Sequence, residues 1–307
     1  MSWGRILAVG EIILALTVWG VGLWGVAVGQ AYIVQWLYFF AWYPYIRFLD
    51  GLLYWLKGES WLISRPRDLM RMFFWSVTVW LVFEAFNLVL RNWGYIGVEP
   101  TGWVRWSGYA MAFATVLPGV LLTAEVLAAL GAWRHSRGRP RDLANWQPFS
   151  LLAGMVMLVL PLIYPQYAFA LVWGAFFFLL DPFSDLLGGK SLIRSFGAGE
   201  RREFYCLLTA GLFCGLWWEA WNYLSSTKWV YTLPMFQFWK VFEMPLLGYL
   251  GFLPFALECA VMYNFLDALE KRLRSHPRSL RLAYCLHIAF WLALFAAMDR
   301  WTVISFR

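Results

Sequence analysis

The chain has 307 residues, of which 62% are hydrophobic and 14% are charged, and its mean hydropathy is +0.59. A soluble domain carries about a quarter charged residues, so this composition excludes an ordinary soluble globular fold. The net charge of +7 would suit a nucleic-acid partner if it were clustered, but the basic residues fall in short segments between long apolar runs.

Apolar runs long enough to cross a bilayer recur from one end of the chain to the other, which indicates an all-α polytopic membrane protein. The first run is longer than a signal-peptide core, so we expect it to be retained. In chain order, the nine expected transmembrane helices lie near residues 5–28, 30–48, 72–91, 107–132, 147–163, 166–181, 204–224, 243–267 and 281–303.

The basic residues predict an orientation for these helices. Most of the 25 Lys and Arg lie at the N-terminus or in the loops at 47–71, 133–146, 182–203 and 268–281, which are every second connection. The positive-inside rule then places the N-terminus in the cytoplasm and the C-terminus on the opposite side of a plasma (inner) membrane. The positive charge is thereby assigned to orientation and lipid headgroups, and no nucleic-acid partner is expected.

The sequence also contains an internal repeat. Residues 42–60 align without gaps on 173–191, pairing Trp42 with Trp173 and Asp50 with Asp181, and three further matches follow in the same order at nearly constant spacing. Such a pattern predicts two tandem four-helix repeats in the same orientation plus a final helix. The expected domains are a first repeat at 1–134, a basic cytoplasmic linker at 135–146, a second repeat at 147–270, and a basic loop with the final helix at 271–307.

Two of the repeated segments place a glutamate and an asparagine inside apolar helices. Residues 82–88 read VFEAFNL and residues 217–223 read WWEAWNY. An ionisable group in the hydrocarbon region normally faces the bundle interior, and residues three apart share a helix face. We therefore expect Glu84 with Asn87, and Glu219 with Asn222, to be candidate catalytic groups. The alternative is that each pair only hydrogen-bonds to neighbouring segments and locks the two halves together.

The remaining candidates come from the flanking segments. Glu258 and Glu243 are further candidate catalytic carboxyls, while Glu125 and His287 are candidate substrate contacts, with a structural hydrogen bond as the alternative for His287. The aromatic side chains expected to wall a substrate are Trp93, Tyr95, Trp218, Trp221, Trp229 and Tyr231.

Common cofactor and metal motifs are absent from the sequence. It contains no Walker loop, dinucleotide fingerprint, HExxH or Gly-x-Ser-x-Gly segment, and the four cysteines show no CxxC spacing. We accordingly expect neither a cofactor nor a metal ion.

The order of these motifs resembles that of the integral-membrane lycopene cyclase family: an acidic, aromatic helix, then Trp-x-Tyr, then a Gly- and Pro-containing helix ending in Glu. The Trp218-Glu219 pair also resembles the Trp-Glu motif of fungal membrane terpene cyclases. The resemblance covers roughly residues 75–130 and 210–265. The chain departs from these families in having more expected helices and no paired Pro-x-Glu-Glu motif.

This resemblance implies redox-neutral chemistry on an isoprenoid. Glu219 would be the acid, with Asn222 orienting it and Glu84 as its counterpart, and Glu243 or Glu258 would be the base. Two other classes stay open, a secondary transporter or channel and a non-catalytic lipid-binding subunit of a membrane complex. The expected partners are membrane lipids or a lipid-like substrate, with a homo-oligomer or a larger membrane complex also open.

Overall fold

In the computed structural model, which describes residues 3–141 and 143–306, the chain is almost entirely helical. Seven helical segments of the described chain are long and apolar enough to cross a membrane, which makes this an integral membrane protein. They are α1 (Trp3–Ala27), α5 (Pro66–Leu90), α6–α7 (Gly102–Ala114 and Val116–Ala129), α8 (Trp146–Ile163), α9–η1–α10 (Pro165–Ala168, Phe169–Leu171 and Val172–Leu186), η2–α13 (Leu246–Gly251 and Phe252–Leu273) and α14 (Pro277–Trp301).

Two further long helices, α3 (Leu37–Lys57) and α12 (Arg202–Leu224), coincide with the remaining expected segments. Both are rich in Trp and Tyr and contain ionisable residues, and neither is among the seven segments that are apolar enough to count as spans. The short helices α2 (Ala31–Gln35), α4 (Trp61–Ser64) and α11 (Leu192–Gly197) lie in the connections.

Some boundaries differ from the expected ones. The second expected helix was to end near residue 48, but α3 continues to Lys57, where Gly58 adopts a left-handed conformation with φ of 79°. The fourth is divided at Thr115, because Pro118 has no N–H for the helical bond to the carbonyl of Ala114. The eighth was to begin at 243, yet this part forms the strands β3 (Lys240–Val241) and β4 (Met244–Pro245) before η2 begins.

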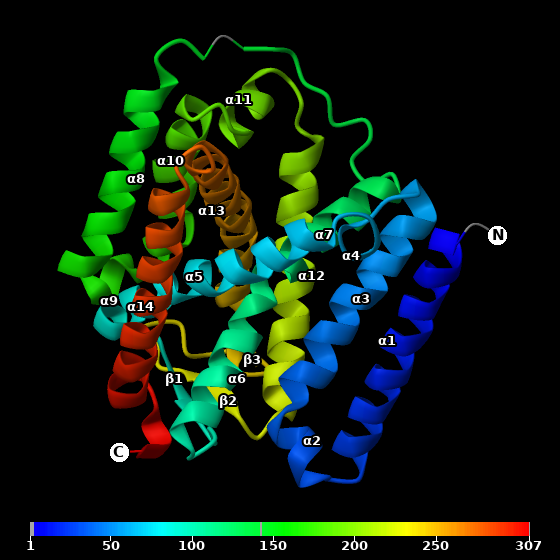
Figure 1. Cartoon of the computed structure of the whole chain (residues 1–307). Coiled ribbons are helices and arrows are strands. Elements are labelled where there is room, and N and C mark those ends of the chain that lie inside the picture. The colour runs from blue at the N-terminus through cyan, green and yellow to red at the C-terminus, as the bar shows by residue number, and fades with distance from the viewer. Residues whose placement is uncertain (1–2, 142, 307) are drawn as a thin grey trace.

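Side-by-side packing of the helices joins the two halves of the chain. Helix α1 packs on α3, α8 packs on α10, and α14 packs on α5, whereas α12 contacts both α7 and α13 (Figure 1). The contact between α12 and α7 joins segments from the two sequence halves. Figure 1 also shows that α11 and the α7–α8 connection lie at the opposite end of the bundle from β1 (Trp93–Ile96) and β2 (Lys228–Tyr231).

Two aspartates brace equivalent connections at the end that carries α4 and α11. Asp50 accepts hydrogen bonds from the Ser60 hydroxyl (2.6 Å) and from the Trp61 backbone N–H (2.8 Å). Asp181 accepts in the same way from Ser191 (2.5 Å) and from the Leu192 N–H (2.8 Å). In each case the serine side chain also caps the short helix that follows, so the aligned residues make aligned contacts.

Candidate functional site

The two Trp-x-Tyr segments form a two-stranded antiparallel sheet with each other. Strand β1 follows α5 and strand β2 follows α12, and the register pairs Trp93 with Tyr231 and Tyr95 with Trp229. Each tryptophan is therefore opposite the tyrosine of the other segment. This ribbon brings together residues that are far apart in the sequence, and it lies at the ends of the two helices that carry the Glu-x-x-Asn motifs.

The two asparagines of those motifs anchor the ribbon to its helices. The Asn87 amide accepts from the backbone N–H groups of Asn92 (2.9 Å) and Trp93 (3.2 Å) and donates to the Trp93 carbonyl (2.9 Å). Asn222 accepts from the Trp229 N–H and donates to the Trp229 carbonyl, both at 2.9 Å. Asn222 was expected to orient Glu219, but its amide instead holds the backbone of Trp229.

Glu84 is fully buried beneath β1. Its Oε1 accepts from the indole N–H groups of Trp80 and Trp93, each at 3.0 Å, and from the Tyr95 hydroxyl at 2.5 Å. Three donors on a single carboxyl oxygen form a hydrogen-bond network that holds these rings in place.

Glu219 occupies the equivalent position beneath β2 with fewer partners. Its Oε1 accepts from the Tyr231 hydroxyl at 2.6 Å, and that hydroxyl itself accepts from the Trp229 indole N–H at 3.0 Å. The second carboxyl oxygen of Glu219, like that of Glu84 and of Glu258, is buried and has no hydrogen-bond partner in the part of the chain described by the structure. Burial and the neighbouring carboxyl raise the pKa of Tyr231 well above its ordinary value, so its hydroxyl stays protonated and serves as a donor.

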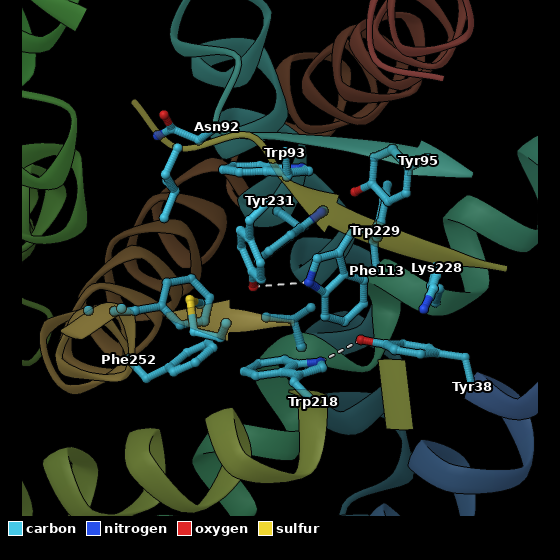
Figure 2. A pocket seen from close by; sticks show the side chains of 18 of the residues that line it. Tyr38, Asn92, Trp93, Tyr95, Phe113, Trp218, Lys228, Trp229, Tyr231 and Phe252 are labelled. Atoms are coloured by element: carbon cyan, nitrogen blue, oxygen red, sulfur yellow. Dashed lines mark hydrogen bonds between the residues drawn. The ribbon is translucent and has the colours of Figure 1, made fainter. Parts of the chain in front are cut away.

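A cavity of about 460 Å³ opens beside this ribbon. Aromatic and aliphatic side chains make most of its wall, with contributions from α2, α3, α5, α6, α10, α12, η2, α13 and both strands. Figure 2 shows Tyr231 and Trp229 in the middle of the site, with Trp218 and Tyr38 joined by a hydrogen bond at one side. A concave, mostly apolar space of this size with a few polar groups is typical of small-molecule sites.

Five of the aromatic residues proposed from the sequence line this cavity, namely Trp93, Tyr95, Trp218, Trp229 and Tyr231. Trp221 instead packs against Trp42 and Trp217. Glu84 and Glu219 are not among the residues that line the cavity. Each instead accepts a hydrogen bond from a tyrosine that does, Tyr95 for Glu84 and Tyr231 for Glu219.

The other candidates lie at separate positions. Glu258 accepts from the Phe176 N–H at 2.8 Å, where the backbone at Trp173 and Gly174 leaves helical geometry, and so it satisfies a donor freed by that break. Glu243 pairs with Lys228 at 2.7 Å in the loop beside β2.

Glu125 and His287 also make local contacts. Glu125 accepts from the Trp61 indole N–H at 2.8 Å, near the Asp50 brace. The His287 ring lies 3.4 Å from the Thr78 hydroxyl, between α14 and α5. Among the residues that the structure describes, no group of three or more His, Cys, Asp or Glu side chains is arranged to hold a metal ion.

Several lining residues carry no signal in the sequence, including Tyr38, Trp80 and Tyr109. They come from three different helices, and nothing in their local spacing distinguishes them from other aromatic residues of the apolar runs. Asn92 and Lys228, by contrast, could have been found, because each directly precedes a Trp-x-Tyr segment and both line the cavity.

Comparison with known proteins adds no relative: no family model, curated protein or solved structure matches the chain.

Proposed function

We propose that this protein is an integral membrane enzyme that binds a lipid or isoprenoid in the aromatic cavity and acts on it by proton transfer. The observation that carries the proposal is the position of Tyr231, which lines the cavity while its hydroxyl binds the buried carboxyl of Glu219 at 2.6 Å. A carboxyl that binds the hydroxyl of a lining residue can exchange protons with the cavity without being exposed to it.

The chemistry that this arrangement favours is protonation of an alkene or epoxide. For this step the Tyr231 hydroxyl turns away from the Glu219 carboxyl, to which it donates in the structure, and gives its proton to the substrate carbon or oxygen. Glu219, in its carboxylic acid form, donates its own proton to the Tyr231 oxygen. The π or C–O bond breaks and a carbocation forms. The resulting Glu219 carboxylate takes a proton back through Tyr231 from a carbon beside the cation, so the substrate is isomerised or cyclised with no oxidant or reductant.

The wall of the cavity suits such a cation. Trp93, Trp218 and Trp229 line the space, and the electron-rich faces of aromatic rings attract a positive charge. Because few competing polar groups surround them, this attraction would be stronger than at an exposed site. The resemblance to membrane isoprenoid cyclases agrees with this chemistry and is part of the proposal.

The proposal includes an architecture of nine spanning helices, built as two tandem repeats plus α14. It is supported by the matching contacts of Asp50 and Asp181, of Asn87 and Asn222, and of the two Trp-x-Tyr strands. By the positive-inside rule, the basic loops support a cytoplasmic position for α4, α11 and the N-terminus, and a position for the ribbon on the outer side of a plasma membrane.

Proton transfer can be tested with the purified protein in liposomes made up in D2O, with squalene and its terminal epoxide as probes. The wild type is expected to introduce deuterium into a rearranged product, detected by mass spectrometry. Tyr231→Phe, which keeps the ring and removes the exchangeable proton, should lower this rate by at least about a hundredfold, the lower range for a general acid. Glu219→Gln should do the same.

Tyr45→Phe is the matched control, because Tyr45 is also buried and loses a hydroxyl bond of 2.7 Å to Thr123, but it does not line the cavity. It should retain turnover. If Tyr231→Phe forms the deuterated product at the wild-type rate, the proposed role of this hydroxyl is contradicted.

One observation favours a second candidate, a lipid-binding subunit without chemistry. Glu84 accepts three donors and the asparagines hold the ribbon backbone, so much of this polar network is structural. If this alternative holds, native mass spectrometry should detect a retained lipid in the wild type and in Glu219→Gln alike. Neither protein should then introduce deuterium into the probes.

A further inference from the structure

The side chain of Asn92 is the unusual polar group of the cavity. Asn92 lines the cavity and is only 1% exposed, yet both its amide nitrogen and its amide oxygen have no hydrogen-bond partner among the described residues. Burying an amide without hydrogen-bond partners costs free energy, so native proteins seldom leave one in this state. A partner supplied by a bound ligand would remove this cost.

The backbone of Asn92 is held firmly by other residues. Its N–H donates to the Asn87 amide oxygen at 2.9 Å, and its carbonyl accepts from the Thr232 N–H at 2.8 Å. The preceding residue, Arg91, ends α5 in a left-handed conformation with φ of 52°. The main chain is thus positioned from both sides while the side chain takes no part, so the asparagine is not needed for the local fold.

The equivalent position of the second Trp-x-Tyr segment holds a different group. Lys228 directly precedes Trp229 as Asn92 precedes Trp93, and it also lines the cavity, but its ammonium pairs with Glu243 at 2.7 Å. Figure 2 shows Asn92 and Lys228 on opposite sides of the view, with Trp93 and Tyr231 between them. One side of the cavity therefore has a neutral, unsatisfied amide and the other has a charge that is already compensated.

We infer that Asn92 binds a hydroxyl group of the ligand, which makes the ligand a hydroxyl-bearing isoprenoid or lipid. The asparagine side chain has an oxygen that accepts and an NH2 group that donates. A single hydroxyl group can accept from Nδ2 and donate to Oδ1 at the same time. A pure hydrocarbon leaves both atoms unsatisfied, and a carboxylate faces Oδ1 with like charge. This inference rests on the proposed binding of a lipid or isoprenoid in the cavity and specifies which kind.

Binding can be measured by quenching of tryptophan fluorescence in the detergent-solubilised full chain. The probes are geranylgeraniol and the matching hydrocarbon in which a methyl group replaces the CH2OH. Asn92→Leu, which has similar volume and no polar atoms, should weaken geranylgeraniol binding about tenfold or more, as expected for the loss of both hydrogen bonds to the hydroxyl. It should leave the dissociation constant of the hydrocarbon unchanged or lower it.

Thermal unfolding without ligand gives an independent measurement. Asn92→Leu should unfold at the same temperature as the wild type or a higher one, because it removes an unsatisfied amide. Asn87→Leu, a matched change five residues earlier at an amide whose nitrogen and oxygen are both hydrogen-bonded, should unfold at a clearly lower temperature. Asn92→Ala repeats the binding test with a side chain that is too small to obstruct the ligand.

The outcomes separate the inference from the proposed function. If Asn92→Leu and Asn92→Ala bind geranylgeraniol as tightly as the wild type does, the inference is wrong while the cavity stays a binding site. Equal weakening of alcohol and hydrocarbon binding also overturns it, since the effect is then one of shape. If neither probe binds to the wild type, the proposed function fails, and the inference fails with it.

Discussion

At the scale of single residues, the same side chains act as a clamp and as a candidate site. Asn87 and Asn222 hold backbone groups of Trp93 and Trp229, whereas Glu219 reaches the cavity only through Tyr231. The sequence predicted either a catalytic pair or a structural lock. The contacts of the asparagines with backbone groups favour the structural role for these two residues, and Glu219 stays the proposed acid.

Removal of the Asn222 amide is expected to destabilise the protein. Asn222→Leu leaves the N–H and carbonyl of Trp229 without this partner, and each such group costs about 1–3 kcal/mol when it is shielded from water. The free energy of unfolding, measured with denaturant in detergent micelles, should fall by about 2 kcal/mol or more. Gln237→Leu, at an exposed glutamine whose side chain donates to the Leu233 carbonyl, serves as the control. Equal stability of the two variants would contradict the clamp.

At the scale of elements, close helix contacts determine how the cavity is enclosed. Helix α12 meets α13 where Gly211 lies against Phe252, and a Cβ atom added to Gly211 would lie 2.1 Å from the Phe252 carbonyl oxygen. Since Phe252 also lines the cavity, this contact sets the position of one wall. A substituent at this glycine must move one helix, because the nearest atom belongs to the backbone.

Gly211→Ala is therefore expected to lower the unfolding free energy by about 1–3 kcal/mol, the usual cost of overpacking. Gly20→Ala is the matched control, because Gly20 lies within α1 and a Cβ there would meet nothing within 4 Å. The control should be neutral or slightly stabilising, as alanine is the better helix former. A comparable loss in both variants would show that the contact with Phe252 is not the cause.

At the scale of the whole molecule, the alternation of basic loops predicts which end faces the cytoplasm. The test uses a background in which the exposed Cys285 is replaced by Ala, with one new cysteine at a time. Arg139→Cys lies in the exposed α7–α8 connection, and Trp239→Cys lies at a residue that is 78% exposed beside the ribbon. A membrane-impermeant maleimide should label position 239 in intact cells and position 139 only after permeabilisation. The reverse pattern would contradict the proposed orientation.

The sequence by itself determined the membrane class, the position of every long helix to within two or three turns, and the motifs that recur. These follow from local physical properties: an apolar run long enough for the bilayer must be helical to satisfy its backbone, whatever surrounds it. The same locality explains the errors at Lys57, Thr115 and residue 243, where hydropathy changes gradually and proline or glycine decides the boundary.

Only the tertiary structure decided that the two Trp-x-Tyr segments pair with each other, that Glu84 and Glu219 bind tyrosines of a cavity wall, and that the side chain of Asn92 has no hydrogen-bond partner among the described residues. The pairing and the cavity both depend on contacts between segments more than a hundred residues apart in the chain. Such contacts are selected by packing and hydrogen-bond satisfaction over the whole bundle, which a residue's own neighbours in sequence do not specify. The aligned motifs predicted which residues correspond to each other, and the fold determined what those residues face.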